Sequence, residues 1–317
     1  MMTMFFMMAC IGELPEEQFE KYVLLTHNGW IEQDVQVSND YTASFPIVVS
    51  ISGTSKNKEH VGVKLAYEPE LLERYNIEKY KLQEDLYYAI VPEDAISFKT
   101  DLQIADGEES TLTDLVIDFN KITDPYKDYV LPIRVVSTDK YSLQELESAS
   151  ILKRSEALYH IRRVNDFSGD YSGSSTVYQT SGRGTDQSPY NNKGTGTPVP
   201  LKTLYALSDS ECYFFAGQFD RNNVFRNDFI VKVQIDANDS VIFSSPNPAL
   251  QLRNESSSMV TGRKNLPTDE RYEIVTKVFS FSYTYYDLTD KSDSTASNNH
   301  ILRAVGTMSR ERKELKE

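Results

Sequence analysis

The sequence lacks the groups on which several protein classes depend. Of its 317 residues, only two are cysteines, four are histidines and one is a tryptophan. Two cysteines cannot build a disulfide-rich scaffold, and no Cys-x-x-Cys pair or Cys/His cluster supplies the ligands of a zinc site. Glycine and proline are also scarce, at 14 and 12 residues, which excludes a collagen-like or low-complexity chain. No apolar run approaches the ~20 residues that a membrane-spanning helix requires.

Positive charge is in deficit, and the deficit lies in one half of the chain. The sequence has 33 Lys and Arg against 47 Asp and Glu, a net charge of −14, which argues against nucleic acid as a partner. Residues 1–158 carry 14 basic and 28 acidic side chains, whereas residues 159–317 carry 19 of each. This break predicts two domains, 18–158 and 159–317, preceded by a separate segment, 1–17.

The N-terminal segment is apolar up to a cysteine and polar after it. Met7-Met8-Ala9-Cys10 resembles a loose bacterial lipobox, in which the cysteine is lipidated, although no basic residue precedes it and Met7 stands where leucine is usual. Glu13, Glu16 and Glu17 resemble the acidic tether of Bacteroidetes surface lipoproteins. Residues 1–17 are therefore expected to be a signal remnant and tether, with Cys10 as the lipidation site. The alternative is an ordinary apolar N-terminus with a chance cysteine.

The first half predicts an all-β domain with one short helix. Val61, Val63 and Leu65 fall on one face of an expected strand, and turn-forming residues separate this strand from others. A helix is expected over Pro69–Tyr75, because proline suits a first helical turn. The expected strands are Tyr22–Thr26, Gln33–Ser38, Ser44–Ser52, His60–Tyr67, Leu86–Ile90, Ala95–Ile104, Thr113–Phe119 and Tyr129–Ser137. Strands of this number and length predict an antiparallel sandwich of immunoglobulin type.

The second half shows strand patterns without a helical one, which predicts a small β-barrel or a second sandwich. The expected strands are Tyr171–Gln179, Leu201–Leu207, Glu211–Gly217, Phe229–Asp236, Val241–Ser244, Tyr272–Tyr286 and Ile301–Ser309. Thr138–Arg163 has weak periodicity and is expected to contain the interdomain connection. Thr180–Pro198 is rich in Gly, Ser, Thr and Asn, and is expected to be a long loop that is either disordered or functional.

No pattern of residues selects a catalytic, metal or cofactor site. A glycosidase needs two placed carboxylates, but no motif singles out a pair among 47. The four histidines lie far apart in the sequence, and no GxSxG, Walker A or GxGxxG motif occurs. Cys212 lies in a strand-like run and is expected to be a small buried side chain rather than a nucleophile. The sequence therefore predicts a protein that is not an enzyme and uses no metal or cofactor.

Aromatic residues give the one positive indication of a ligand. Phe279, Phe281, Tyr283 and Tyr285 share one face of an expected strand. This face is interpreted first as barrel core, and alternatively as a platform on which the apolar faces of sugars stack. Two other aromatic residues, Trp30 after the Asn28-Gly29 turn and Tyr190 in the long loop, are further candidates for glycan binding.

Several segments together resemble a family of two-domain Bacteroidetes surface lipoproteins. These segments are Glu17–Val23, the helix Pro69–Asn76, the strand Tyr129–Val135, and then Phe167–Tyr171, Phe281–Asp287 and Ala304–Met308. The resemblance implies an Ig-like N-terminal domain of unknown function, which also precedes some secreted endoglycosidases, followed by a lipocalin-like β-barrel. This chain has no room for the catalytic barrel of those endoglycosidases.

The resemblance also implies a location and a role. Such proteins accompany outer-membrane glycan- or nutrient-uptake systems. The expected function is a lipid-anchored surface protein, held to the outer membrane through its lipid alone, which assists capture of glycans or other nutrients with partners in an uptake complex. A structural or adhesive protein-interaction module is the alternative, and a glycoside hydrolase or its accessory is the third.

Overall fold

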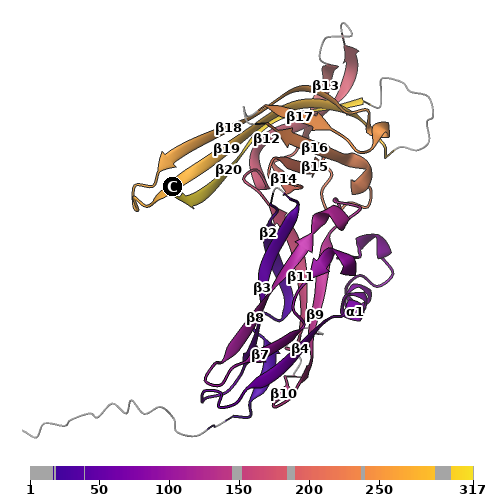
Figure 1. Cartoon of the computed structure of the whole chain (residues 1–317). Coiled ribbons are helices and arrows are strands. Elements are labelled where there is room, and N and C mark those ends of the chain that lie inside the picture. Colours follow the sequence, from indigo (N-terminus) through magenta and orange to yellow (C-terminus); the bar gives the residue numbers. More distant parts are fainter. Residues whose placement is uncertain are drawn as a thin grey trace, which may run out of the picture.

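The computed structural model describes residue 17 and residues 19–38, 40–144, 152–183, 190–236, 240–289 and 301–316. Most of this part of the chain is β-strand, and two β domains lie end to end (Figure 1). The all-β prediction, with a sandwich before a barrel, is confirmed. Cys10 lies outside the described residues. No helix in the described residues is long and apolar enough to cross a membrane.

The first domain is built from short strands, one α-helix and three 3-10 turns. The strands are β1 (Tyr22–Leu25), β2 (Gly29–Gln36), β3 (Thr42–Ile51), β4 (Val61–Tyr67), β5 (Ala89–Ile90), β6 (Ile96–Ser97), β7 (Asp101–Ile104), β8 (Ser110–Asp118), β9 (Tyr129–Thr138), β10 (Ser142–Leu143) and β11 (Glu156–Val164). The helices are α1 (Pro69–Tyr80), η1 (Glu84–Leu86), η2 (Glu93–Ala95) and η3 (Phe119–Lys121). The helix starts at the predicted proline and continues five residues past the predicted end at Tyr75.

Two sheets of the first domain pack face to face. One has the order β10-β1-β3-β8-β6, and the other has the order β2-β11-β9-β4-β7 with β5 beside β9. Alternate residues such as Ile47, Val63 and Ile133 point between the sheets and form a single apolar core. The sandwich is not wholly antiparallel as predicted, because β11 runs parallel to β2.

Strand β11 lies between β2 and β9 in the sheet of the first domain, with partners on both sides. The predicted domain boundary after residue 158 falls inside this strand, so the first sheet continues to Val164. The sequence pattern did not predict this strand, because Glu156–Ile161 is buried on both faces and its residues do not alternate between apolar and polar.

The second domain is formed by one strongly curved nine-stranded sheet. Its strands are β12 (Gly169–Arg183), β13 (Tyr190–Pro198), β14 (Leu201–Ala206), β15 (Glu211–Phe215), β16 (Ile230–Ile235), β17 (Val241–Ser244), β18 (Arg253–Asn265), β19 (Tyr272–Tyr286) and β20 (Ile301–Leu315). Two 3-10 turns, η4 (Arg226–Phe229) and η5 (Pro248–Leu250), connect strands.

The sheet curls into a nearly closed barrel. Its order is β17-β16-β15-β14-β12-β20-β19-β18, and a bridge between Ser240 and Ser258 links the first strand to the last. Ser257 Oγ also donates to the Val241 carbonyl at 2.7 Å. The outer parts of β18, β19 and β20 continue past the barrel as a three-stranded extension (Figure 1).

The segment Thr180–Pro198 is not the loop that its composition predicts. Strand β12 runs to Arg183, and β13 returns beside it with shifts in register. Most side chains of β13 are exposed, so the polar composition reflects a solvated hairpin rather than missing structure. The turn residues 184–189 lie outside the described part of the chain.

Candidate functional site

The two domains are joined by a buried turn instead of an open linker. Asn165 follows β11 directly and is buried. Its side-chain amide donates to the carbonyls of Ser208 (2.5 Å) and Glu211 (3.1 Å) in the second domain, and its Oδ1 accepts from the backbone N–H of Ser168 (2.8 Å). These bonds bind the connection to the barrel and fix the direction in which β12 starts.

Further contacts hold the domains together around this turn. The rings of Tyr126 and Tyr213 meet edge to face with centroids 5.2 Å apart. Arg221 of the second domain forms an ion pair with Asp128 of the first. The two domains therefore present a defined surface to each other, and a cavity between them has a fixed lining.

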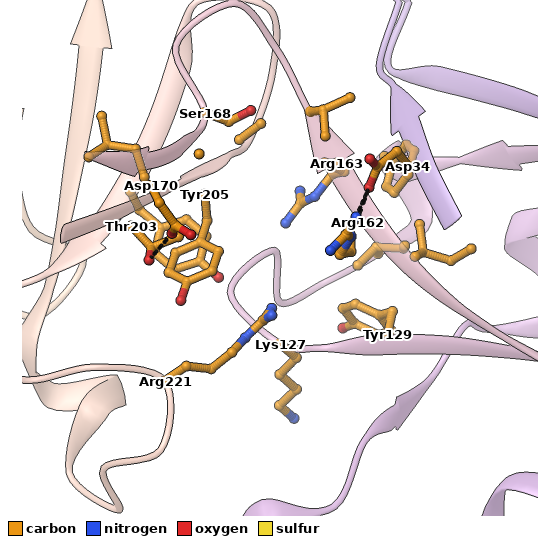
Figure 2. A pocket seen from close by; sticks show the side chains of 18 of the residues that line it. Asp34, Lys127, Tyr129, Arg162, Arg163, Ser168, Asp170, Thr203, Tyr205 and Arg221 are labelled. Carbon is orange, nitrogen blue, oxygen red and sulfur yellow. Dashed lines mark hydrogen bonds and ion pairs between the residues drawn. The ribbon is translucent and has the colours of Figure 1, made fainter. Parts of the chain in front are cut away.

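A cavity of about 430 Å³ opens at this junction, and we call it the interdomain cleft (Figure 2). Its charged lining consists of Asp34, Lys127, Arg162, Arg163, Asp170, Arg221 and Arg312. Its hydroxyl and aromatic lining consists of Phe119, Tyr129, Ser168, Thr203, Tyr205 and Tyr213. Small and aliphatic residues complete the wall. The cleft combines polar groups with aromatic surface, which is the composition of small-ligand sites.

Most charged groups of the cleft have partners. Arg162 Nη2 lies 2.7 Å from Asp34 Oδ1, and its Nε lies 3.5 Å from Glu32 Oε2. Arg221, besides pairing with Asp128, stacks over the ring of Tyr205 with 4.7 Å from Cζ to the centroid. Burial lowers the pKa of Arg221, but an arginine keeps its charge near neutral pH.

Arg163 differs from the other cations of the cleft. Its Nη2 donates to the Pro125 carbonyl, and its Cζ lies 5.6 Å from the centroid of the Phe119 ring. Among the described residues, no carboxylate oxygen lies within 4.0 Å of the Arg163 guanidinium, whereas Arg162 forms an ion pair with Asp34. Burial lowers its pKa, and Figure 2 shows its side chain extending into the space between the domains.

A polar ladder on the outer face of the first domain continues from the cleft. In the parallel register of β2 and β11, Glu32 lies beside His160 and Asp34 beside Arg162. Glu32 accepts hydrogen bonds from Trp30 Nε1 at 2.8 Å and pairs with His160 Nδ1 at 2.7 Å. Burial raises the pKa of Glu32, but the hydrogen bonds from Trp30 and His160, together with the charges of His160 and Arg162, lower it overall. Burial lowers the pKa of His160 despite the adjacent carboxylate.

Trp30 does not offer a free ring face as the glycan-binding prediction requires. Its ring stacks on Tyr75 of α1, with centroids 4.7 Å apart, and packs against Tyr88 at 4.8 Å. Lys79 Nζ lies 5.1 Å from the centroid of the same ring. The chain's own helix thus covers Trp30, which is a packing residue beside the cleft.

The predicted aromatic strand face is core. Phe279, Phe281, Tyr283 and Tyr285 are all buried and pack among the apolar residues of the barrel. The core interpretation is confirmed, and the interpretation as a sugar platform is wrong, because a ring enclosed by other rings cannot stack on a ligand. The side chains became core because the sheet closes around them.

Tyr190 lies at the start of β13, away from the lining of the cleft. Its backbone N–H donates to Glu255 Oε1 at 3.0 Å, and Glu255 also pairs with Arg303 at 2.6 Å. The structure brings together only the four predicted residues of β19, as part of the barrel core, and it places none of the predicted binding residues in the interdomain cleft.

Cys212 is fully buried, in agreement with the prediction of a packing role. Burial raises the pKa of its thiol to about 12, which keeps the thiol protonated and unreactive. Among the described residues, no group of three or more His, Cys, Asp and Glu side chains is arranged to hold a metal ion.

The sequence patterns did not identify the residues of the cleft, because these residues come from distant parts of the sequence and form no local motif. One local signal was available: Arg162 and Arg163 are adjacent at the end of a strand, immediately before the pattern changes. Charged residues at a junction between domains are candidates for a site, because ligands often bind at domain interfaces.

Sequence comparisons also divide the chain into two parts, and the second part begins just before β11, a strand of the first sheet. The family model of a domain of unknown function, DUF4973, matches residues 15–140, and a second model, of a C-terminal domain, matches residues 155–308. Comparison with curated proteins finds no match.

Solved structures with the same two-domain fold come from Bacteroides species. A Bacteroides ovatus protein of unknown function is 18% identical, with a TM-score of 0.77 over 92% of this chain and 95% of its own. A multidomain B. ovatus protein that includes DUF1735 is 17% identical, with a TM-score of 0.74 over 92% and 95%. An auxiliary nutrient binding protein from Bacteroides thetaiotaomicron is 18% identical, with a TM-score of 0.73 over 90% and 92%. At these identities the likeness concerns the fold.

Proposed function

We propose that this chain is a non-enzymatic binding protein that captures a glycan or another nutrient in its interdomain cleft. The cleft itself carries the proposal, because it is a cavity of about 430 Å³ with aromatic, hydroxyl and charged groups on opposite walls. The similarity in fold to an auxiliary nutrient binding protein of Bacteroides thetaiotaomicron supports the same role.

The chemistry of the lining suits a carbohydrate. Tyr205 is half-buried and lines the cleft. Its ring stacks on Tyr213, with centroids 5.0 Å apart, and lies under Arg221, so its ring edge and hydroxyl are the groups that can contact a sugar. Thr203 Oγ1 donates to Asp170 Oδ1 at 2.6 Å, and this pair offers acceptors to sugar hydroxyls. Asp34 and Arg162 form a similar pair on the opposite wall (Figure 2).

Binding is tested with a glycan array and titration calorimetry on the full chain carrying Cys10→Ala. Tyr205→Ala should weaken binding of any glycan that the array identifies, and Tyr190→Ala, the same change outside the cleft, should leave it unchanged. Equal affinity in the wild-type chain and the Tyr205→Ala variant would remove the cleft from the proposal.

The proposal includes attachment to the outer membrane at the cell surface through a lipid on Cys10, beside proteins of an uptake complex. It also takes the sandwich as Ig-like and the barrel as lipocalin-like. The lipid attachment is tested by Cys10→Ala, which should move the protein from the membrane fraction to the soluble fraction of its host. A variant that stays in the membrane with unchanged mass contradicts it.

The absence of catalysis is part of the proposal. In the cleft, Asp34 is bonded to Arg162 and Asp170 accepts from Thr203. A glycosidase instead keeps one carboxylic acid protonated by raising its pKa. Turnover of a glycan by the purified protein, abolished by Asp34→Asn or Asp170→Asn, would refute this part.

The extension of β18–β20 favours a second candidate, a protein-interaction or adhesive module. Beyond the barrel, β18 and β20 form the two edges of the extension, and within the described part of the chain they pair there only with β19 between them. Open strand edges can pair with a strand of another protein. A pull-down that depends on this extension, without any glycan binding, would favour this role.

A further inference from the structure

We propose that the interdomain cleft selects carbohydrates that carry an oxyanion, a carboxylate or a sulfate, and that Arg163 is the residue that recognises this group. The proposal rests on the proposed function, because it names the class of ligand that the same cleft binds.

The charge of the lining is opposite to that of the chain. The cleft is lined by five cationic side chains and two carboxylates, although the whole protein has a net charge of −14. Three carboxylates behind the lining pair with cations: Glu32 with Arg162, Asp124 with Lys127, and Asp128 with Arg221. The cations without a carboxylate partner in the described residues are Arg163 and Arg312.

Arg163 has hydrogen-bonding capacity that the protein does not use. A guanidinium has five N–H donors, and Arg163 directs one nitrogen to the Pro125 carbonyl. Among the described residues, Nε and Nη1 of Arg163 have no hydrogen-bond partner and are not fully buried, and the side chain extends into the space between the domains (Figure 2). Much of the side chain is enclosed by protein, and burial lowers its pKa. A desolvated guanidinium with free donors binds a carboxylate or sulfate strongly.

The opposite wall supplies a second cation to the same space. Figure 2 shows Arg163 entering from the first domain and Arg221 from the second. The Tyr205 ring supports the guanidinium of Arg221, and Asp128 holds one of its nitrogens. Two guanidiniums that converge on one cavity repel each other, and an anion between them relieves the repulsion.

The competing explanation is that Arg163 only holds the domains together. In that case its contact with Pro125 and Phe119 is its whole role, and replacing it changes stability without regard to the charge of a ligand. A neutral and an anionic ligand of the same shape distinguish the two explanations.

The experiment uses oligogalacturonides, which carry one carboxylate per sugar, and the same oligomers with every carboxylate methyl-esterified. Chondroitin sulfate and its desulfated form separate sulfate from carboxylate. We expect the full chain to bind at least one anionic probe at least tenfold more tightly than its neutralised or desulfated form, with affinity that falls as salt rises. Arg163→Gln should weaken anion binding about 10- to 100-fold, because it removes a charged hydrogen bond. Arg271→Gln removes the same charge from the far extension and should have no effect.

The outcomes separate this inference from the proposed function. Equal binding of charged and neutral forms, or equal loss of both in Arg163→Gln, overturns the anion preference and leaves glycan capture standing. If no glycan binds, NMR titration of the Arg163 Nε–H resonance with glucuronate and sulfate decides. A saturable shift supports the anion site and counts against glycan capture, and an unchanged resonance overturns both. A thermal unfolding scan of Arg163→Gln checks that the variant is folded.

Discussion

Replacing Phe279 by alanine tests whether the aromatic face of β19 is structural. Phe279 is fully buried, and its ring lies 5.1 Å from that of Phe281, 5.9 Å from that of Phe243 and 6.1 Å from that of Phe214. A buried Phe→Ala change costs about 3–5 kcal/mol through lost transfer free energy and the cavity left behind. Loss of edge-to-face contacts with several rings places the cost in the upper part of that range.

The assay can assign the loss to one domain, because Trp30 is the only tryptophan and lies in the first domain. Tryptophan fluorescence in urea therefore reports the sandwich, while far-UV circular dichroism reports both domains. With a urea dependence of about 2 kcal/mol per molar, the barrel transition of Phe279→Ala should move down by about 2 M. The fluorescence transition should move much less.

Val260→Ala is the matched control on the neighbouring strand. Val260 is 58% exposed, so its truncation should change the free energy of unfolding by no more than about 0.5 kcal/mol. A barrel that loses less than about 1 kcal/mol in Phe279→Ala would refute the assignment of this face to the core. Glycan affinity that falls in a still-folded variant would do so too.

Three further predictions concern the fold. Burial lowers the pKa of Lys202 to about 7, so between pH 7 and about 10 the unfolded chain binds more protons at this side chain than the folded chain does. The free energy of unfolding should therefore rise with pH over this range. Lys202→Met should remove that rise, measured as the urea midpoint at each pH. A fragment ending at residue 164 should give a cooperative calorimetric transition and one ending at 158 should not, because the latter loses most of the central strand β11; two equally stable fragments contradict this. Gly306→Ala should lower the melting temperature of the barrel, because the added Cβ would lie 2.2 Å from Ser175 Cβ. Thr307→Ala on the same strand is the control, since Gly107, although exposed, has a positive φ that an alanine rarely adopts.

The sequence predicted the parts of the fold in which each strand has one buried and one exposed face. Strand β4 alternates through Val61, Val63 and Leu65, and its observed bounds differ from the predicted ones by a single residue. The alternation pattern did not predict strands whose two faces are equally buried or equally exposed. Strand β11 is buried on both sides and β13 is mostly exposed, so neither alternates.

The candidate site was less predictable than the fold. The aromatic run of β19 has the same period whether it faces core or ligand, and only closure of the barrel decides between them. The cleft depends on residues such as Asp34, Arg163 and Arg221, which lie far apart in sequence and meet only because the domains stack end to end. The pattern of a single sequence reports local structure and does not show which distant residues meet when two folded domains pack together.

The buried turn at Asn165 has a consequence for how a ligand arrives. A pair of domains on a loose hinge closes around its ligand, and the observed binding rate then levels off at the speed of closure. Here the amide of Asn165 is bonded into the barrel, and the Tyr126–Tyr213 contact holds the walls at a set distance. If the cleft binds a ligand as proposed, it should admit only ligands thin enough to enter it, and binding should be a single step whose observed rate grows in proportion to ligand concentration.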